Sequence, residues 1–136
     1  MTFALHPRLE ADTLPVGELG LCAVRLMNDT RFPWLVLVPR RPDLVELFDL
    51  TAGERAQLME EIAAVARALA DTTSALKMNV GAIGNLVAQL HLHVVARQED
   101  DAAWPAPVWG FGKPTPYDPE EAAAFIETLS TAVAVR

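Results

Sequence analysis

Residues 89–96 alternate between apolar and polar side chains, and no other segment constrains the fold of this chain as strongly. A period of two is typical of a β-strand, in which successive side chains point to opposite faces of a sheet. The apolar face, predicted to be buried, comprises Leu90, Leu92 and Val94. The opposite face comprises Gln89, His91, His93 and Val95. Two imidazoles and a carboxamide in one row lose hydration on burial unless each finds a partner, so this face asks for a functional explanation.

The chain has 136 residues, of which 51% are hydrophobic, and this is the size and composition of one compact domain. We therefore expect a single domain over residues 1–136, with a core that needs no disulfide bond. Cys22 is the only cysteine, which excludes an intramolecular disulfide and a cysteine-rich zinc module. A lone cysteine also fits the reducing conditions of the cytoplasm.

The formal net charge is −7, and a strongly acidic chain repels the phosphate backbone of a nucleic-acid polymer. We therefore expect no such polymer among its partners. A single small anion can still bind, because hydrogen-bond donors inside a pocket outweigh a diffuse, screened charge. The start of the sequence lacks a signal-peptide pattern, and no apolar run reaches the roughly 20 residues that span a bilayer. The expectation is a cytoplasmic protein that does not contact membranes.

Apolar segments bounded by turn residues predict the strands. These strands cover residues 19–27, 34–38, 77–83 and 89–96. Pro39 and Pro42 follow the second of them and end it, because proline cannot donate to a sheet ladder. The sequence therefore predicts a sheet with long loops between some of its strands.

Helix-start signals occur at two places. Thr51 and Glu54 have the spacing of a capping box, ahead of apolar residues spaced three and four apart, which predicts a long amphipathic helix. Asp118 and Pro119 predict a C-terminal helix over about residues 119–132. Between the last strand and this helix, four prolines and two glycines in residues 100–117 exclude regular structure. The expected fold is α+β, a mainly antiparallel sheet of about five strands with two main helices.

The paired histidines admit three explanations. Both imidazoles can be satisfied structural groups. They can form a metal site, because histidines two positions apart on a strand are common zinc or iron ligands; however, the only other histidine, His6, lies in an N-terminal segment expected to be mobile. They can also catalyse attack on phosphorus, in which a neutral imidazole is the nucleophile and neighbours donate to phosphoryl oxygens. Asn79 and Asn85 upstream supply donors, and Gly81 and Gly84 allow close approach of the backbone to a ligand.

Residues 89–95 resemble the histidine-triad motif of the HIT superfamily, in which three histidines alternate with apolar residues. The resemblance covers about residues 18–110 and includes Arg40 after the second predicted strand and the pair Trp104 and Pro105. It is closest to a bacterial group similar to diadenosine polyphosphate hydrolases. The resemblance implies a HIT-like fold and a homodimeric nucleotide hydrolase or transferase that requires no metal and no other cofactor.

The resemblance also implies a role for each site residue. His91 would attack the α-phosphorus of a nucleoside phosphoanhydride or phosphoramidate and form a covalent nucleotidyl-histidine, which water then hydrolyses. His93 and Gln89 would complete the catalytic row, with His93 binding and orienting the phosphate. The residues expected to bind substrate are Asn28, which would contact ribose, and Asn79, Gly84 and Asn85.

Two positions depart from the family pattern. Gln89 replaces the first histidine, and Leu86 stands where many members have a Ser or Thr that touches the phosphate or leaving group. One well-placed donor is worth about a hundredfold in turnover. A nucleotide-binding protein with weak or no catalysis is therefore the alternative function.

Three further side chains have a structural and a functional interpretation. Trp104 and Trp109, in the proline-rich loop, either cap the core of their own chain or contact a partner subunit. Arg97 follows the motif and is expected to pair with an acidic side chain rather than with a phosphate.

Overall fold

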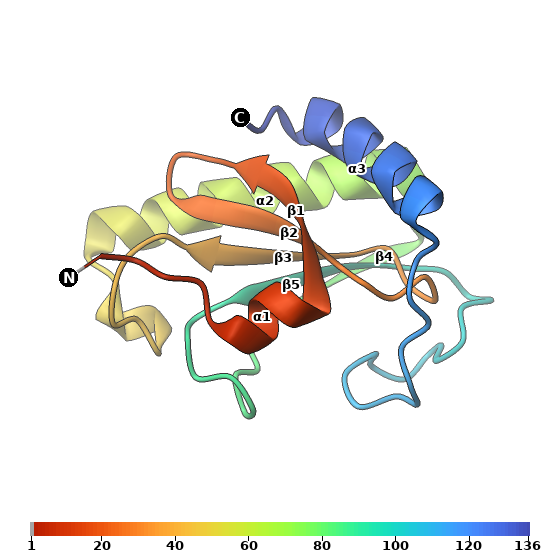
Figure 1. The fold of residues 1–136 in the computed structure, drawn as a ribbon, viewed down its shortest axis with the longest axis horizontal. Coiled ribbons are helices and arrows are strands. Elements are labelled where there is room, and N and C mark those ends of the chain that lie inside the picture. The colour runs from red at the N-terminus through yellow and green to blue at the C-terminus, as the bar shows by residue number, and fades with distance from the viewer. Residues whose placement is uncertain (1) are drawn as a thin grey trace.

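The computed structural model describes residues 2–136. Its elements are, in chain order, α1 (Pro7–Asp12), β1 (Thr13–Glu18), β2 (Cys22–Met27), β3 (Trp34–Pro39), the 3₁₀ helix η1 (Leu47–Asp49), α2 (Ala52–Thr73), β4 (Lys77–Gly81), β5 (Leu92–Arg97) and α3 (Pro119–Val133). The five strands form one antiparallel sheet in the order β1-β2-β3-β5-β4. Helices α2 and α3 cover one face of this sheet, and α1 lies on the other (Figure 1). The expected α+β fold with a five-stranded antiparallel sheet is confirmed.

The central strands β3 and β5 are buried along their whole length. Their register pairs Val36 with His93 and Leu37 with Leu92. Residues paired directly across an antiparallel ladder point to the same face of the sheet. The predicted alternation is therefore present in β5, with leucine toward α2 and histidine toward the opposite face.

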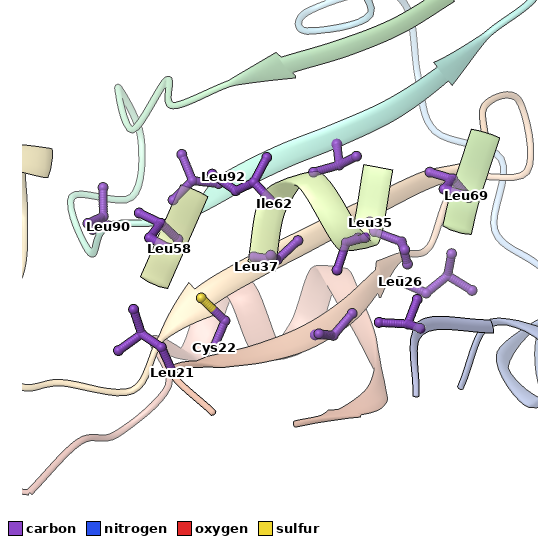
Figure 2. Packing of buried hydrophobic residues seen from close by; sticks show 14 of the residues in the cluster. Leu21, Cys22, Leu26, Leu35, Leu37, Leu58, Ile62, Leu69, Leu90 and Leu92 are labelled. Carbon is purple, nitrogen blue, oxygen red and sulfur yellow. The ribbon is translucent and has the colours of Figure 1, made fainter. Parts of the chain in front are cut away.

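The helix-face core lies between the sheet and the helices α2 and α3 (Figure 2). Leu35, Leu37 and Leu92 from the strands meet Leu58 and Ile62 from α2 in this core. The helix begins where the sequence predicts, because the Thr51 hydroxyl accepts from the Glu54 N–H at 3.2 Å and the Glu54 carboxylate accepts from the Thr51 N–H at 2.9 Å. Capping and apolar spacing therefore act together to seat α2 on the sheet.

Glu61 ties α2 to the start of β2. Its carboxylate accepts from the main-chain N–H groups of Leu21 and Cys22 at 2.8 and 2.9 Å and from Gln57 Nε2 at 2.9 Å. Burial, and secondarily the Glu61 charge, raise the pKa of the Cys22 thiol far above its usual range. Cys22 is thus an inert residue of the helix-face core.

The histidine-face core covers the other side of the sheet. Its buried apolar residues come from α1, the strands and the loops around them: Leu9, Phe32, Trp34, Val36, Val38, Val87, Val95, Ala103 and Val108. Phe3 and Leu5 pack against it, and His6 caps α1 by accepting from the Arg8 N–H at 3.0 Å. The N-terminal segment, which was expected to be mobile, thus packs against the histidine-face core in the structure.

Some boundaries differ from the prediction. Strand β5 begins at Leu92 rather than at residue 89, and β4 ends at Gly81. Residues 82–91 form a loop in which Leu90 N–H donates to the Leu44 carbonyl instead of to a strand. Residues 98–118 contain no helix or strand, as predicted. Within residues 2–136 no helix combines the length and the apolarity that crossing a bilayer demands.

Candidate active site

A cleft of about 410 Å³ opens on the histidine face of the sheet. Its walls come from α1, the end of β2, β3, the loop before β5, β5 and the proline-rich loop. The lining residues are Arg8, Leu9, Asp12, Met27, Trp34, Ile83, Gly84, Asn85, Leu86, Val87, His91, His93, Trp109 and Gly110. The topology therefore gathers these six elements into one cleft that contains the two histidines.

His91 is 6% exposed, and the loop before β5 fixes its ring. Its Nδ1 lies 2.7 Å from the main-chain carbonyl oxygen of Gln89. A carbonyl oxygen can only accept, so in the neutral ring Nδ1 bears the proton and Nε2 bears the lone pair. No group within residues 2–136 bonds to Nε2, which leaves this atom as a nucleophile or a base at the cleft.

His93 is held in the complementary state. The Trp34 indole Nε1 donates to His93 Nδ1 at 3.0 Å, so in the neutral ring the proton of His93 is on Nε2. Burial, followed by the proximity of His91, lowers the pKa of His93 to about 4. The ring centroids of the two histidines are 4.9 Å apart. The cleft thus places His91 Nε2, which carries the lone pair in the neutral ring, beside an N–H donor on His93.

The loop over residues 83–87 forms one lip of the cleft. Gly84 has φ of +65°, a conformation that favours glycine, and it turns the chain so that Asn85 and Leu86 line the opening. Leu86 is 79% exposed. At this lip the chain therefore presents a carboxamide beside an apolar side chain, which agrees with the predicted positions of Gly84 and Asn85 near the histidines.

The structure does not bring the other predicted residues to this cleft. The Gln89 carboxamide bonds to the main chain of Ala4 and His6. Asn79 Oδ1 accepts from Arg97 Nη1 at 2.9 Å. Asn28 lines a second lobe of about 380 Å³ that shares Arg8, Asp12, Met27, Trp34 and Gly110 with the cleft. Its Oδ1 accepts from the Tyr117 N–H at 2.8 Å.

Sequence reasoning missed the residues that α1 contributes to the cleft. Arg8, Leu9 and Asp12 lie on a helix of six residues, too short to produce an amphipathic repeat. The signal that was present is Pro7 at the first helical position after a polar residue. Among the described residues, Arg8 is the one arginine or lysine that lines the cleft, and it pairs with Asp12 at 3.5 Å.

Trp109 and Trp34 flank the His93 ring. Their ring centroids each lie 5.6 Å from that of His93. Trp109 thus packs within its own chain, over Gly81 and His93. Its position depends on the loop that carries it, and the buried side chain of Arg97 holds that loop.

Arg97 is 1% exposed and forms an ion pair with Asp101 at 2.7 Å, as the sequence indicated. It also donates to the carbonyl of Ala106 and to Asn79. The Arg97 guanidinium holds the pKa of the Asp101 carboxyl below its usual range. Arg97 also lies against the Trp104 ring, with its guanidinium carbon 5.5 Å from the ring centroid. Its contacts with Asp101, Trp104 and Ala106 therefore hold the proline-rich loop against the sheet.

A metal site at the two histidines would require at least one further protein ligand beside them. Within residues 2–136, no three His, Cys, Asp or Glu side chains are grouped closely enough to hold a metal ion. His91 and His93 therefore have no third protein ligand beside them, and their Nδ1 atoms are engaged with the protein.

Comparison with known proteins gives a consistent result. A family model of the HIT domain matches residues 8–100. A histidine triad protein from Bradyrhizobium japonicum is 48% identical with a TM-score of 0.95, over 98% of this chain and 99% of that one. One from Sinorhizobium meliloti is 52% identical with a TM-score of 0.95, over 96% and 97%. One from Marinobacter aquaeolei is 42% identical with a TM-score of 0.96, over 98% of both. A search of curated protein sequences gave no match.

Proposed function

Because this chain belongs to the HIT domain family, we propose that it is a nucleotide hydrolase or transferase that acts at an α-phosphate through His91. The substrate class is a nucleoside phosphoanhydride, such as a diadenosine polyphosphate, or a nucleoside phosphoramidate. The observation that carries the proposal is the pair of Nδ1 contacts, a carbonyl oxygen at His91 and an indole N–H at His93, which give the neutral rings opposite tautomers at the cleft.

In the first step, the Nε2 lone pair of His91 forms a bond to the α-phosphorus. The bond from phosphorus to the leaving oxygen or nitrogen breaks, and the leaving group takes the electron pair, with an amine also taking a proton from water. The Nδ1 proton stays on the ring, so the imidazole ring of the nucleotidyl-histidine carries a positive charge beside the negative phosphoryl group. The Gln89 carbonyl, 2.7 Å from Nδ1, stabilises this charge.

In the second step, water attacks the phosphorus and the electron pair of the phosphorus–nitrogen bond returns to His91 Nε2. The proton of the water passes to solvent, and a nucleoside monophosphate is released. The Nε2–H of His93 and the Asn85 carboxamide donate to phosphoryl oxygens in both steps. The low pKa of His93, about 4, makes it a hydrogen-bond donor rather than a source of protons at neutral pH.

The test is the variant His91→Ala, assayed on a panel of dinucleoside polyphosphates and amine-linked adenylates. We expect wild-type protein to show a transient nucleotidyl adduct by intact mass, and the variant to show neither adduct nor turnover. Arg67→Ala, at an exposed pair on α2, is the control that keeps full activity. Hydrolysis by a folded His91→Ala protein shows that the nucleophile assignment is wrong. Turnover lost in EDTA and restored by a metal shows that metal independence is wrong.

A nucleotide-binding protein with weak or no catalysis is the second candidate. The direction of the Gln89 side chain favours it, because the family's first histidine is replaced by a group that bonds to the N-terminal segment instead of facing the cleft. The exposed Leu86 adds no donor at the lip. This candidate is supported if the protein binds a nucleoside monophosphate but forms no nucleotidyl adduct with any substrate of the panel.

We also propose that the protein is a homodimer that pairs along β4. This strand ends the sheet, so one of its edges has no partner strand among residues 2–136. Exposed apolar side chains surround it: Leu47, Phe48, Met59 and Val80. An apolar groove of about 310 Å³ runs between η1, α2 and β4, and a second copy would cover it. A cytoplasmic location, which the single cysteine favours, completes the proposal.

A further inference from the structure

The side chain of Gln89 joins two segments that are far apart in the sequence. Its Nε2 donates to the carbonyl of Ala4 at 2.8 Å, and its Oε1 accepts from the main-chain N–H of His6 at 2.9 Å. One carboxamide thus satisfies a carbonyl and an N–H of the same segment, as the edge of a neighbouring strand would.

We call residues 2–6 the N-terminal arm. Its side chains alternate, with Phe3 and Leu5 half-buried against the histidine-face core and Ala4 and His6 exposed. The arm leads directly into α1, whose first turn is capped by the His6 side chain. The two hydrogen bonds to Gln89 therefore fix the arm immediately before the point at which α1 begins.

The same residue also holds the nucleophile. The Gln89 carbonyl accepts from His91 Nδ1 at 2.7 Å, while α1 supplies Arg8, Leu9 and Asp12 to the opposite wall of the cleft. The arm, the α1 wall and the His91 ring are consequently all positioned from one residue, although Gln89 itself is not among the residues that line the cleft.

We propose that Gln89 is a positioning residue, whose side chain fastens the N-terminal arm so that α1 closes one wall of the nucleotide cleft. The proposal rests on the proposed function, because it assigns that wall to nucleotide binding. A carboxamide suits this task because it is donor and acceptor at once, whatever the pH. A carboxylate has no donor and an imidazolium has no acceptor, so neither can bond to both groups of the arm.

The test uses two variants of different severity. Gln89→Met keeps the length of the side chain and loses both hydrogen bonds, whereas Gln89→Glu keeps the acceptor for His6 and loses the donor for Ala4. Gln98→Met is the matched control, because the Gln98 amide donates only to the carbonyls of Thr73 and Ser74, which do not line the cleft. Each protein is examined by amide hydrogen exchange, by adenosine monophosphate titration and by steady-state kinetics.

We expect Gln89→Met to speed amide exchange in residues 2–12. We also expect it to raise KM and the dissociation constant of adenosine monophosphate by about fivefold to tenfold, the factor for loss of one or two exposed hydrogen bonds, with kcat changed by less than about twofold. Gln89→Glu should fall between wild type and Gln89→Met, and Gln98→Met should match wild type.

Unchanged exchange in the arm of Gln89→Met overturns the proposal. A fall in kcat with unchanged KM also overturns it, and shows instead that Gln89 acts on the reacting phosphate. The exchange and titration results do not depend on turnover. They therefore decide the role of Gln89 even if the wild-type protein proves to have no hydrolase activity.

Discussion

At the scale of single residues, the chemistry of the cleft depends on which ring nitrogen of each histidine is occupied by the protein. His91 has its Nδ1 against a carbonyl oxygen, and His93 has its Nδ1 against the Trp34 indole N–H. A carbonyl and an indole N–H each have only one hydrogen-bonding role. The two neutral rings therefore differ in tautomer although the residues are only two positions apart in the sequence.

The pKa of His93 makes the stability of the protein depend on pH. The folded-state pKa is about 4, below the ordinary value of 6.5, so as pH falls the unfolded chain takes up the proton first. This contribution to the free energy of unfolding is complete above pH 6.5 and is lost as pH falls toward 4. At 1.36 kcal/mol per pKa unit, the loss is about 3 kcal/mol at most.

The variant His93→Asn removes the titrating ring and keeps an acceptor near Trp34. We expect urea unfolding between pH 7 and pH 4.5 to show a loss of stability about 2 kcal/mol larger in wild type than in this variant. Equal losses of stability in the two proteins would show that the surroundings of His93 do not lower its pKa.

The row of polar side chains was partly predictable from alternation alone. His91 and His93 reach the cleft because Leu90 and Leu92, which alternate with them, pack in the helix-face core. Gln89 breaks the pattern, because strand pairing begins only at Leu92 and the carboxamide finds main-chain partners in the arm. Asn79 was expected to bind substrate, but its oxygen accepts from Arg97. Such competing partners come from distant parts of the chain and have no signal in a local pattern.

At the scale of elements, the proline-rich loop behaves as an ordered wall of the cleft although it contains no helix or strand. Its order comes from one buried ion pair, Arg97 with Asp101, and from the acceptors that Asp101 offers to main-chain N–H groups of the loop. Trp109 and Gly110, which this loop carries, line the cleft. Polar side-chain contacts therefore hold this loop in place, whereas a strand is held by main-chain hydrogen bonds to its neighbours.

Breaking this pair should be costly. We expect Asp101→Asn to lower the free energy of unfolding by about 3 kcal/mol or more, because it leaves the Arg97 charge buried without a counter-charge. Arg67 and Asp71 form an ion pair with the same spacing on the surface of α2, and Asp71→Asn should cost less than about 1 kcal/mol. Denaturant unfolding of the two variants gives the comparison; similar costs contradict the assigned role of Arg97.

The elements with strong start signals were predictable and the short ones were not. Helices α2 and α3 begin at the expected residues because their start signals are local, a capping box in α2 and a proline at the first position of α3, where Asp118 makes no side-chain cap. Strand β1 contains Pro15 and Gly17, and a shift in register between them interrupts the alternation. Strand β1 is stabilised by its main-chain hydrogen bonds to β2. Helix α1 is stabilised by the burial of Leu9 in the histidine-face core. Both depend on contacts that only the assembled sheet supplies.

At the scale of the whole molecule, an acidic chain of net charge −7 presents an apolar edge at β4. Charge of one sign opposes association, so a homodimer must gain its stability from apolar burial. We expect Val80→Glu, on the exposed part of β4, to convert the dimer to a monomer in light scattering with size exclusion. Val45→Glu, at an exposed apolar position that does not line the β4 groove, is the control. A wild-type monomer at all concentrations contradicts the dimer proposal.

The burial of β3 and β5 on both faces gives the chain two apolar layers with different tolerance to change. Substitutions in the layer under α2 and α3 disturb only packing, so many combinations of similar volume should preserve activity whenever the protein folds. The layer under α1 also determines the positions of the Trp34 indole and of the two imidazoles. Variants of that layer can fold well and still be inactive, so a library screened for both properties would separate the two faces of one sheet.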